Sequence, residues 1–258
     1  MNVLLILAAG KSSRFGGYPK AFCKINNEYV IQRTINLGKK YYDRIYAVIS
    51  REIYPEYKDA AKDCKTLCIG TGQGDAHSFL RAARLIRKDC RADRMTLCWG
   101  DTFFMNGQIF KKAAAAEIKE SSAGISLCSV DPKPYAWYET EGDTIKAARF
   151  RNTDGVIESG IHDQSVFVFN TAVILSQLES FMRYTGINDA KDYISREVSR
   201  EMKLLHSFTY FYENNLLPMH YSLIETGNSY SFNTDGELEN IKKMINARKK
   251  EAGICITQ

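Results

Sequence analysis

LLILAAGKSSRFGGYPK, residues 4–20, is the stretch that decides the fold, because a continuously apolar run stops at a polar loop within it. Residues 3–8 are all apolar, as is typical of a strand buried on both faces of a parallel sheet. The loop that follows is rich in glycine, hydroxyl and basic residues. Open α/β sheets bind their ligands at the carboxyl ends of such strands. The stretch therefore predicts an N-terminal strand whose end faces a phosphorylated ligand.

Individual residues of this loop suit the binding of phosphate. Gly10 lacks a Cβ, so that backbone N–H groups can approach phosphate oxygens closely. Arg14 would add a forked guanidinium group and Lys20 a mobile ammonium group. Neither the P-loop motif GxxxxGK[ST] nor the dinucleotide-binding motif GxGxxG follows the strand. The alternative interpretation is a solvated connection whose basic residues only maintain solubility.

Strands and helices alternate through the first half of the chain. Strands are predicted over residues 3–8, 44–50, 66–69, 95–99 and 124–130, and helices over residues 30–38, 54–62, 75–88 and 109–119. The helices carry apolar residues on one face, while the strands are short apolar runs. Alternation at this spacing predicts βαβ units with right-handed crossovers and a parallel sheet.

The pattern changes after Pro132, where short strands and turn signals replace the alternation. A meander is predicted over residues 136–140, 144–151 and 156–160, further strands over 165–169, 208–212 and 220–224, and helices over 172–182, 190–202 and 236–250. No linker rich in proline, glycine or serine divides the chain. We therefore expect a single domain over residues 1–258. Its predicted architecture is an α/β, three-layer αβα Rossmann-like domain with a mostly parallel mixed central sheet and a small additional β-meander.

The composition excludes several classes of protein. The 258 residues include 35 Lys and Arg against 30 Asp and Glu, and a net charge of +5 is too small to indicate a nucleic-acid partner. No apolar run approaches the roughly 20 residues that a membrane span requires. Seven irregularly spaced cysteines without a C-x-x-C pair indicate reduced thiols, and the N-terminus lacks the basic region of a secretory signal. We expect a cytoplasmic protein with no nucleic-acid or membrane partner.

Three further segments suit a nucleotide and a metal ion. Residues 68–76, CIGTGQGDA, either let a flat ligand approach the backbone or form a structural turn. Asp101 follows the strand predicted over residues 95–99, where its carboxylate would bind Mg²⁺ together with substrate phosphates. A turn cap is the alternative role for this aspartate. Residues 229–238, SYSFNTDGEL, open the last helix and contain several good capping residues.

LAAGKSSRFGGYPK, residues 7–20, resembles the signature L-A-[AG]-G-x-[GS]-[ST]-R-[MLF]-x(n)-P-K of nucleotidyltransferases with a Rossmann-like domain of the glycosyltransferase-A type. This superfamily includes sugar-1-phosphate nucleotidyltransferases, phosphocholine and alditol-phosphate cytidylyltransferases, and molybdenum-cofactor nucleotidyltransferases. The resemblance implies that Arg14 and Lys20 act on the phosphates as catalytic residues. The nucleotide-binding residues that it implies are Leu7, Ala8, Ala9, Gly10, Lys11, Ser12, Ser13, Gly70, Thr71, Gly72 and Asp75.

The same resemblance implies a site for Mg²⁺. Asp101 ends an element similar to the superfamily's strand-Gly-Asp, whose aspartate coordinates the metal ion. Asn233 begins NTDGEL, which resembles the segment [DN]-[TS]-x-x-[DE]-L, whose first residue provides the second metal oxygen. Other registers of this segment put Ser231 or Asp235 in that place.

Candidate acceptor-binding residues lie between these segments. Tyr135 begins a strand pair similar to that of sugar nucleotidyltransferases, with Ala136 in place of the usual glycine. Lys146 and Arg149 follow on the next predicted strand, either to bind the phosphate of the acceptor or as part of a solvated face. Asn170 belongs to an element that resembles the superfamily's strand-Asn-x-[GA] beside the acceptor.

The resemblance implies a Mg²⁺-dependent reaction that joins an NTP, with CTP or UTP favoured, to a sugar-1-phosphate, an alditol phosphate or a phosphocholine-like compound and releases pyrophosphate. Residues 1–130 would form the NTP-binding half, and residues 131–258 the acceptor-binding half with its closing helix. The alternatives are a molybdenum-cofactor-type nucleotidyltransferase and a non-catalytic nucleotide-binding regulator. A related glycosyltransferase would need an Asp-x-Asp motif, whereas residues 100–102 contain a single aspartate. A homodimer is compatible with the sequence, although no residue points to it.

Overall fold

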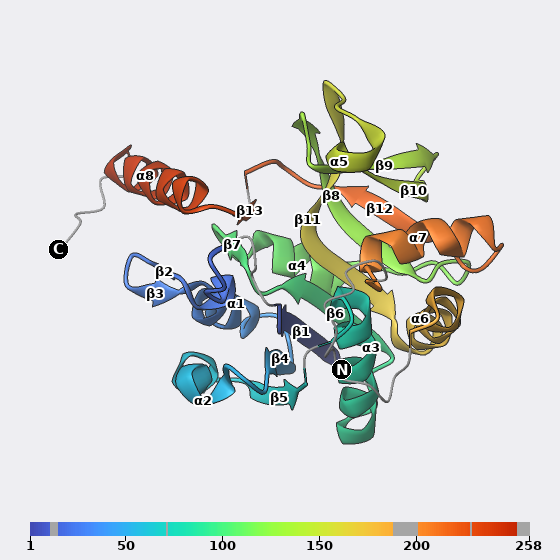
Figure 1. Cartoon of the computed structure of the whole chain (residues 1–258), viewed down its shortest axis with the longest axis horizontal. Helices are drawn as coiled ribbons and strands as arrows, with labels where there is room; N and C mark the ends of the chain where they lie inside the picture. The colour runs from blue at the N-terminus through green and yellow to red at the C-terminus, as the bar shows by residue number, and fades with distance from the viewer. Residues whose placement is uncertain (11–14, 71, 188–200, 228, 252–258) are drawn as a thin grey trace.

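The computed structural model describes residues 1–10, 15–70, 72–187, 201–227 and 229–251 of the chain. Nine strands form one mixed sheet in the order β5-β4-β1-β6-β11-β8-β12-β10-β9 (Figure 1). These strands are β1 (Asn2–Ala8), β4 (Arg44–Ser50), β5 (Lys65–Ile69), β6 (Arg94–Trp99), β8 (Gly124–Pro132), β9 (Ala136–Glu141), β10 (Thr144–Phe150), β11 (Ser159–Asn170) and β12 (Met219–Leu223). Both halves of the chain therefore contribute strands to the same sheet.

Helices cover both faces of this sheet, as Figure 1 shows. The described α-helices are α1 (Val30–Gly38), α2 (Tyr54–Tyr57), α3 (Asp75–Asp89), α4 (Gln108–Ala115), α5 (Arg151–Asp154), α6 (Thr171–Thr185), α7 (Leu204–Glu213) and α8 (Asp235–Glu251). On one face, α3, α6 and α7 bury Phe79, Leu178 and Phe208 in one apolar cluster. On the other face, α1 and α4 bury Ile35 and Phe110 in a second cluster. The predicted αβα, Rossmann-like fold class is confirmed.

β1 is the strand predicted from residues 3–8, and it is buried on both faces. Side chains alternate across a strand, so that Leu5 enters the cluster beneath α3 and Ile6 enters the cluster beneath α1. β1 pairs in parallel with β4 and with β6. The carboxyl ends of these three strands therefore meet at one edge of the sheet.

The other half of the sheet mixes parallel and antiparallel neighbours. β11 runs antiparallel to β6 and to β8, while β12 is parallel to β8. β9 and β10 form an antiparallel hairpin, and β10 pairs with β12. The predicted meander therefore extends the central sheet, and its third predicted strand, residues 156–160, ends inside the long strand β11.

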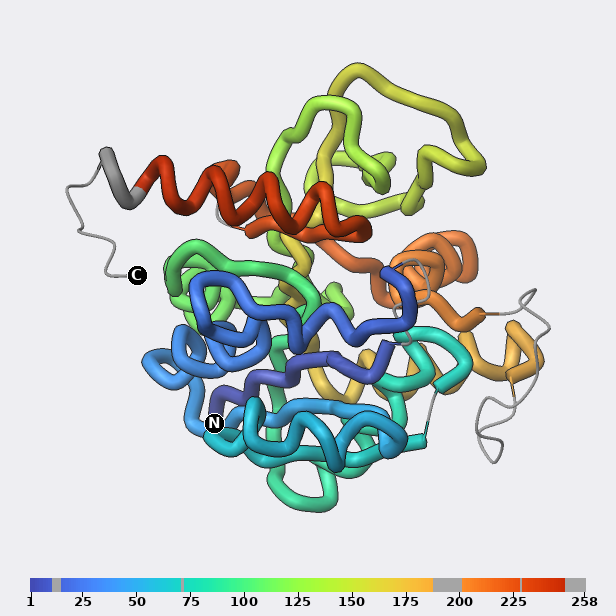
Figure 2. The backbone as a smooth tube through the Cα atoms, turned by 60° about the vertical axis from the view of Figure 1, so that its left-hand side comes forward, coloured from blue at the N-terminus to red at the C-terminus, as the bar shows by residue number. Residues whose placement is uncertain are grey.

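Two small sheets lie beside the main sheet. Their strands are β2 (Lys24–Ile25) with β3 (Glu28–Tyr29), and β7 (Thr102–Phe104) with β13 (Ser229–Ser231). The apolar face of α8 packs on both of them, because Leu238 and Ile241 share a cluster with Ile25 and Phe103. Figure 2 shows α8 running past the N-terminal segment of the chain. The last helix thus closes one side of the molecule, over the segments that follow β1 and β6.

The strand predicted over residues 208–212 is wrong, because this segment lies in helix α7. Its sequence, FTYFY, favours a strand locally, since aromatic and β-branched residues are enriched in strands. Leu204, Phe208 and Phe211 are nevertheless fully buried at the i, i+4, i+7 spacing of one helix face. Burial against the sheet outweighs the local propensity here.

Two helices are shorter than predicted. The helix expected over residues 109–119 ends at Ala115, where the guanidinium of Arg94 donates hydrogen bonds to the carbonyl oxygens of Ala113, Ala114 and Ala116. The helix expected over residues 54–62 is divided into α2 and a 3-10 helix, Lys58–Ala61.

The helix predicted over residues 190–202 lies almost entirely outside the described residues. Within the described part of the chain, none of the helices is long and apolar enough to cross a membrane.

Candidate active site

A glycine lies where the ends of β1 and β6 pack against each other. Leu7 on β1 pairs with Trp99 on β6, and the backbone N–H of Gly100 donates to the carbonyl oxygen of Leu7 at 2.9 Å. A Cβ on Gly100 would lie 2.8 Å from the Cβ of Ala8, closer than two carbon atoms can approach. Gly100 therefore lets Asp101 leave β6 directly beside the end of β1.

Lys20 reaches the same place from the loop after β1. It is the first residue of a 3-10 helix, Lys20–Phe22, which Phe22 anchors by stacking on Tyr57 with 4.4 Å between the ring centroids. The ammonium of Lys20 forms an ion pair with the carboxylate of Asp101. The Lys20 side chain is 14% exposed and that of Asp101 is 35% exposed, so that this ion pair is open to a ligand from one side.

Asn233 completes a group of three residues around the Lys20 ammonium. This ammonium donates to the carbonyl oxygen of Phe232 at 3.1 Å and to the side-chain Oδ1 of Asn233 at 3.3 Å. The side-chain oxygens of Asp101 and Asn233 therefore face one point, at present taken by the positive charge of Lys20. We call Lys20, Asp101 and Asn233 the lysine junction.

The antiparallel pair of β7 and β13 explains why Asn233 lies beside Asp101. Thr102 at the start of β7 is paired with Ser231 at the end of β13, and their hydroxyl oxygens are 3.1 Å apart. Asp101 precedes Thr102 and Asn233 follows Ser231 by two positions, so both residues leave this pair at the same end. Sequence reasoning did not predict either three-residue strand, because strands this short carry almost no periodicity.

The residues after Asn233 have the capping role that their composition suggests. Thr234 and Glu237 form a capping box at the start of α8, in which the Glu237 carboxylate accepts from the N–H of Thr234 at 3.1 Å and the Thr234 hydroxyl accepts from the N–H of Glu237 at 3.2 Å. The side chain of Asn233 takes no part in this cap and points to Lys20 instead. Of the residues considered for the second metal oxygen, Asn233 accepts a hydrogen bond from Lys20, whereas the Ser231 hydroxyl bonds to Thr102.

The lysine junction fits a metal ion that arrives with a polyphosphate. Mg²⁺ prefers oxygen ligands and is commonly held by one or two protein side chains together with substrate phosphates. Asp101 and Asn233 supply two such oxygens directed at one point. In the described part of the chain, no group of three or more His, Cys, Asp and Glu residues could hold a metal ion by itself. Phosphate oxygens would therefore have to provide the remaining ligands.

The predicted phosphate loop is described only in part. Lys11, Ser12, Ser13 and Arg14 lie outside the described residues, as does Thr71. Leu7, Ala8 and Ala9 are buried at the end of β1, whereas Gly10 is exposed. Among the described residues, no atom would lie within 4 Å of a Cβ added to Gly10.

The glycine-rich segment after β5 is shaped by packing inside the protein. A Cβ on Gly72 would lie 2.2 Å from the hydroxyl of Ser78. Gly74 has a φ of +114°, and a Cβ there would lie 2.4 Å from the carbonyl oxygen of Met202. That carbonyl accepts from the N–H of Ala76 at 3.0 Å. Close contact between chain segments therefore explains two of these glycines, and Gly70 follows directly after β5.

Asp75, predicted to bind the nucleotide, lies between the amino ends of two helices. Its carboxylate accepts from the N–H of Ala76 at the start of α3 and from the N–H of Leu204 at the start of α7, each at 2.7 Å. Loss of hydration raises the pKa of Asp75 to about 6, against the opposing effect of these two N–H groups. The structure thus gives Asp75 a role in joining α3 to α7.

Asn170, predicted to bind the acceptor, lies at the opposite edge of the sheet from the lysine junction. It pairs with Arg94, the first residue of β6, whereas Asp101 follows the last one. Seven residues of extended chain span about 20 Å. The side chain of Asn170 caps α6 by accepting from the N–H of Val173 at 3.2 Å. The structure therefore separates this residue from the candidate site.

The other three predicted acceptor residues lie on or beside the β9–β10 hairpin: Lys146 and Arg149 belong to β10, and Tyr135 directly precedes β9. Arg149 forms ion pairs with Glu139 at 2.9 Å and with Asp154 at 3.7 Å. The Lys146 ammonium lies 5.6 Å from the centroid of the Tyr212 ring. Tyr135 is 43% exposed. These side chains form a solvated surface on which the charge of Arg149 is already balanced.

Arg33 supports the site but was not predicted. From α1, its Nε donates to the carbonyl oxygen of Phe104 and its Nη2 donates to that of Met105, both at 2.6 Å. Its guanidinium also lies over the ring of Phe103, 4.8 Å from the centroid. These contacts fix the segment that follows Asp101. The only signal in the sequence is one basic residue among the apolar positions of α1.

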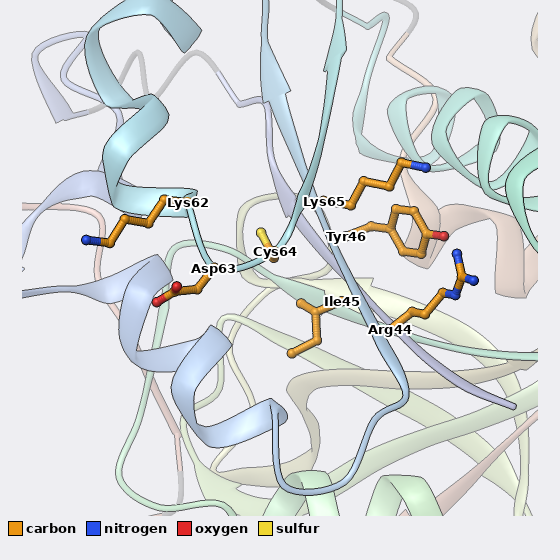
Figure 3. Close-up of a pocket in the computed structure, with 7 residues that line it drawn as sticks. All are labelled: Arg44, Ile45, Tyr46, Lys62, Asp63, Cys64 and Lys65. Atoms are coloured by element: carbon orange, nitrogen blue, oxygen red, sulfur yellow. The ribbon is translucent and has the colours of Figure 1, made fainter.

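A separate pocket of about 460 Å³ lies at the amino ends of β4 and β5 (Figure 3). Arg44 and Lys65 begin these two strands, and both pair with Asp89, at 3.4 and 2.5 Å. Asp63 at the same pocket pairs with Lys39 at 3.3 Å. The pocket therefore lies at the edge of the sheet opposite to the lysine junction, and three of its charged side chains are already paired.

Comparison with solved structures identifies the fold. The inositol-1-phosphate CTP transferase from T. maritima superposes with a TM-score of 0.71 at 17% identity, covering 99% of this chain and 98% of that chain. A Bacillus anthracis protein assigned as a glucose-1-phosphate thymidylyltransferase gives a TM-score of 0.65 at 12% identity, covering 95% of each chain. HddC from Yersinia pseudotuberculosis gives 0.64 at 13% identity, covering 95% of this chain and 99% of that chain. At these identities the similarity is one of fold alone.

Comparison with sequence families is more specific. No curated protein matches the chain significantly in sequence. The model of the MobA-like NTP transferase domain matches residues 4–177, which is well over half of the chain and includes Lys20 and Asp101. The predicted nucleotidyltransferase resemblance is therefore confirmed, and the chain belongs to the family of MobA-like NTP transferase domains.

Proposed function

We propose that this NTP transferase joins a nucleoside triphosphate to a phosphorylated small molecule in a Mg²⁺-dependent reaction that releases pyrophosphate. The observation that carries the proposal is the lysine junction, where Lys20, Asp101 and Asn233 meet beside the ends of β1 and β6. One fixed cation and two oxygen ligands at the carboxyl edge of the parallel half of the sheet are suited to a metal-bound polyphosphate.

The proposed chemistry needs no protein nucleophile. An oxygen of the acceptor phosphate forms a bond to the α-phosphorus of the NTP, and the bond from this phosphorus to the bridging oxygen of pyrophosphate breaks. The electron pair of the broken bond leaves with pyrophosphate. Because the acceptor phosphate is already an anion, no general base is required. The work of the protein is then to position two phosphates in line and to neutralise their charge.

Each residue of the lysine junction has a distinct part in this scheme. Lys20 supplies a positive charge whose position is fixed by contacts with two segments of the chain. Asp101 and Asn233 would hold Mg²⁺ through a carboxylate and an amide oxygen. When bound, the metal ion would stabilise negative charge on the phosphates. Arg14 and the hydroxyl groups of Ser12 and Ser13 remain predicted phosphate-binding groups.

The substrates are proposed from the sequence and from the structural neighbours. A cytidine or uridine triphosphate is favoured, and the T. maritima neighbour, which spans nearly the whole of this chain, is a CTP transferase. That neighbour acts on inositol-1-phosphate, and the B. anthracis protein is assigned to glucose-1-phosphate. We propose a phosphorylated polyol or sugar as the acceptor, or a phosphocholine-like compound, and hence a nucleoside-diphosphate-linked product.

The test is pyrophosphate release from four NTPs crossed with a panel of acceptors. The panel contains hexose-1-phosphates, inositol and alditol phosphates, phosphocholine and a molybdopterin preparation, each with and without Mg²⁺. Asp101→Asn is the test variant, because it removes the charge but keeps the shape. Asp63→Asn is the matched control, because Asp63 is an exposed aspartate that pairs with a lysine at the opposite edge of the sheet.

One NTP–acceptor pair that releases pyrophosphate only with Mg²⁺, and is lost in Asp101→Asn but kept in Asp63→Asn, would support the proposal. Pyrophosphate release with molybdopterin as the only active acceptor would identify a molybdenum-cofactor-type enzyme instead. Equal activity in Asp101→Asn and in wild type would contradict the role given to the lysine junction. Tight NTP binding without release from any acceptor would favour a nucleotide-binding regulator.

A further inference from the structure

A buried glutamine on β11 connects the main sheet to the strand that leads to Asn233. We propose that Gln164 is a positioning residue, which holds the start of β13 so that Asn233 stays directed at Asp101 and Lys20. This inference rests on the proposed function, because it assigns Asn233 to the metal site.

A β-bulge gives Gln164 its position. The pairing of β11 with β8 shifts register between Asp163 and Val166, which leaves Gln164 and Ser165 outside the regular ladder. Ser165 has a φ of +64°, a conformation that residues other than glycine adopt at some cost. The carboxylate of Asp163 supports it by accepting from the N–H of Ser165 at 3.0 Å. Bulges occur preferentially beside active sites, where they redirect a side chain.

The amide group of Gln164 is fixed by partners on both sides. Its Nε2 donates to the hydroxyl of Ser129 at 2.6 Å and to the carboxylate of Asp131 at 3.1 Å. Its Oε1 accepts from the hydroxyl of Ser229 at 2.7 Å. Gln164 is 6% exposed, and Ser129 is fully buried. The carboxylate on one side and the hydroxyl donor on the other define which end of the amide carries oxygen.

The hydrogen bond from Ser229 to Gln164 holds one end of β13. This strand belongs to the small sheet with β7, outside the nine-stranded sheet. Its other end is held by Ser231, through Thr102, and by Asn233, through Lys20. With both ends fixed, the five residues from Ser229 to Asn233 have little freedom. Loss of the Gln164 contact would let β13 move at its start and would weaken the alignment of Asn233.

The expected effect is a weaker metal site. Some residues orient a metal ligand without touching the metal ion, and their loss typically weakens metal binding by about 10- to 100-fold. Because Gln164 acts through a short strand, we expect the lower end of this range, about tenfold. At saturating Mg²⁺ the turnover should stay within about twofold of wild type, since Lys20 and Asp101 are untouched.

The test measures metal binding directly, with Mn²⁺ as a paramagnetic substitute for Mg²⁺ in the presence of saturating NTP. The variants are Gln164→Leu, Ser229→Ala and the double variant, followed by electron paramagnetic resonance titration. We expect a loss of about tenfold in each single variant and no further loss in the double variant, because both remove the same contact.

Gln177→Leu is the matched control. Gln177 is buried to the same degree, at 7% exposure, and its Nε2 donates to the carbonyl oxygen of Leu217 at 2.9 Å. It belongs to α6, so its loss should affect stability without affecting Mn²⁺ affinity. Thermal unfolding of every variant shows whether it is folded. If Gln164→Leu proves unstable, Ser229→Ala removes the same contact by the loss of a single hydroxyl group.

The outcomes separate this inference from the proposed function. Mn²⁺ affinity within twofold of wild type in both folded single variants, or equal losses in Gln177→Leu, would overturn the role of Gln164. If wild type binds Mn²⁺ with NTP but no acceptor gives pyrophosphate, the proposed function fails while the binding comparison still decides the role of Gln164. If wild type binds no Mn²⁺ with any NTP, the metal site and the positioning of Asn233 are both contradicted.

Discussion

The side-chain oxygen of Asn233 lies 3.3 Å from the ammonium of Lys20, although 213 positions separate these residues in the chain. The same ammonium forms an ion pair with Asp101, so that one cation joins three distant segments. Lys24 and Asp63, which are residues of the same types, have other partners. Paired substitutions can therefore separate the role of the site from general effects on folding.

Replacement of Lys20 by methionine removes the charge and keeps most of the apolar stem. We expect turnover to fall by about 10²- to 10³-fold, the loss that follows removal of one preorganised electrostatic group. Lys24→Met is the control, because the Lys24 ammonium lies over the Tyr29 ring, 4.7 Å from its centroid, on the short strand β2. Steady-state pyrophosphate release measures both. Wild-type turnover in Lys20→Met would exclude a catalytic role for this lysine.

Substitution of the two asparagines that the sequence analysis singled out should have different effects, one on Mg²⁺ dependence and the other on stability. Asn233→Ala is expected to raise the Mg²⁺ concentration for half-maximal rate by about tenfold or more, with little effect on stability. Asn170→Ala removes the cap of α6 and should lower the free energy of unfolding by about 1 kcal/mol, with unchanged kinetics. Urea unfolding and Mg²⁺ titration of the rate distinguish the two. A changed KM for the acceptor in Asn170→Ala would show that Asn170 takes part in acceptor binding.

Two glycines at the edge of the sheet give a similar contrast. Gly100→Ala places a methyl group 2.8 Å from the Cβ of Ala8, and overpacking of this kind costs about 1–3 kcal/mol of stability. A methyl group at Gly10 meets no atom of the described residues within 4 Å, so the stability of Gly10→Ala should stay within about 0.5 kcal/mol of wild type. If the loop encloses phosphates, Gly10→Ala should instead weaken NTP binding. Chemical unfolding and calorimetric titration of NTP measure the two effects. Equal stability losses would contradict the packing argument.

The pH dependence of stability should report on Asp75. Because burial raises the pKa of its carboxyl from 3.8 to about 6, the folded state binds more protons than the unfolded state between these values. The free energy of unfolding therefore falls as the pH rises through this window. Asp75→Asn keeps an oxygen for the N–H groups of Ala76 and Leu204 and removes the charge, so this fall should become smaller.

Urea unfolding of wild type and Asp75→Asn at pH 4, 5, 6 and 7 measures the difference. Asp63→Asn is the control, because this side chain is exposed and pairs with Lys39. Identical pH profiles for wild type and Asp75→Asn would show that folding does not raise the pKa of the Asp75 carboxyl.

The parallel half of the fold and one side of the site could be predicted from the sequence. β1 is apolar at every position from Val3 to Ala8, and such a run is easily recognised. Asp101 follows a short buried strand, so its place at the carboxyl edge also follows from local pattern. These features depend on residues that are neighbours in the chain, which is why one sequence is enough to find them.

The other side of the site depends on contacts between distant segments. Asn233 reaches Lys20 only because three residues of β13 pair with three residues of β7. The glycines of residues 70–74 resemble a ligand-binding turn, yet Gly74 is required by its contact with Met202, more than one hundred positions later. Phe208 is a strand former locally and becomes helical through burial on the sheet. Periodicity and propensity contain no information on such partners.

The pairing of β7 with β13 also sets an order of events during synthesis of the chain on the ribosome. Lys20 and Asp101 emerge early and can meet as soon as β1 and β6 are paired. Residues 229–233 emerge later and must still fold back beside β7. The side-chain oxygen of Asn233 is therefore the last of the three groups to reach the site. A nascent chain stalled after β12 would contain Lys20 and Asp101 but not Asn233.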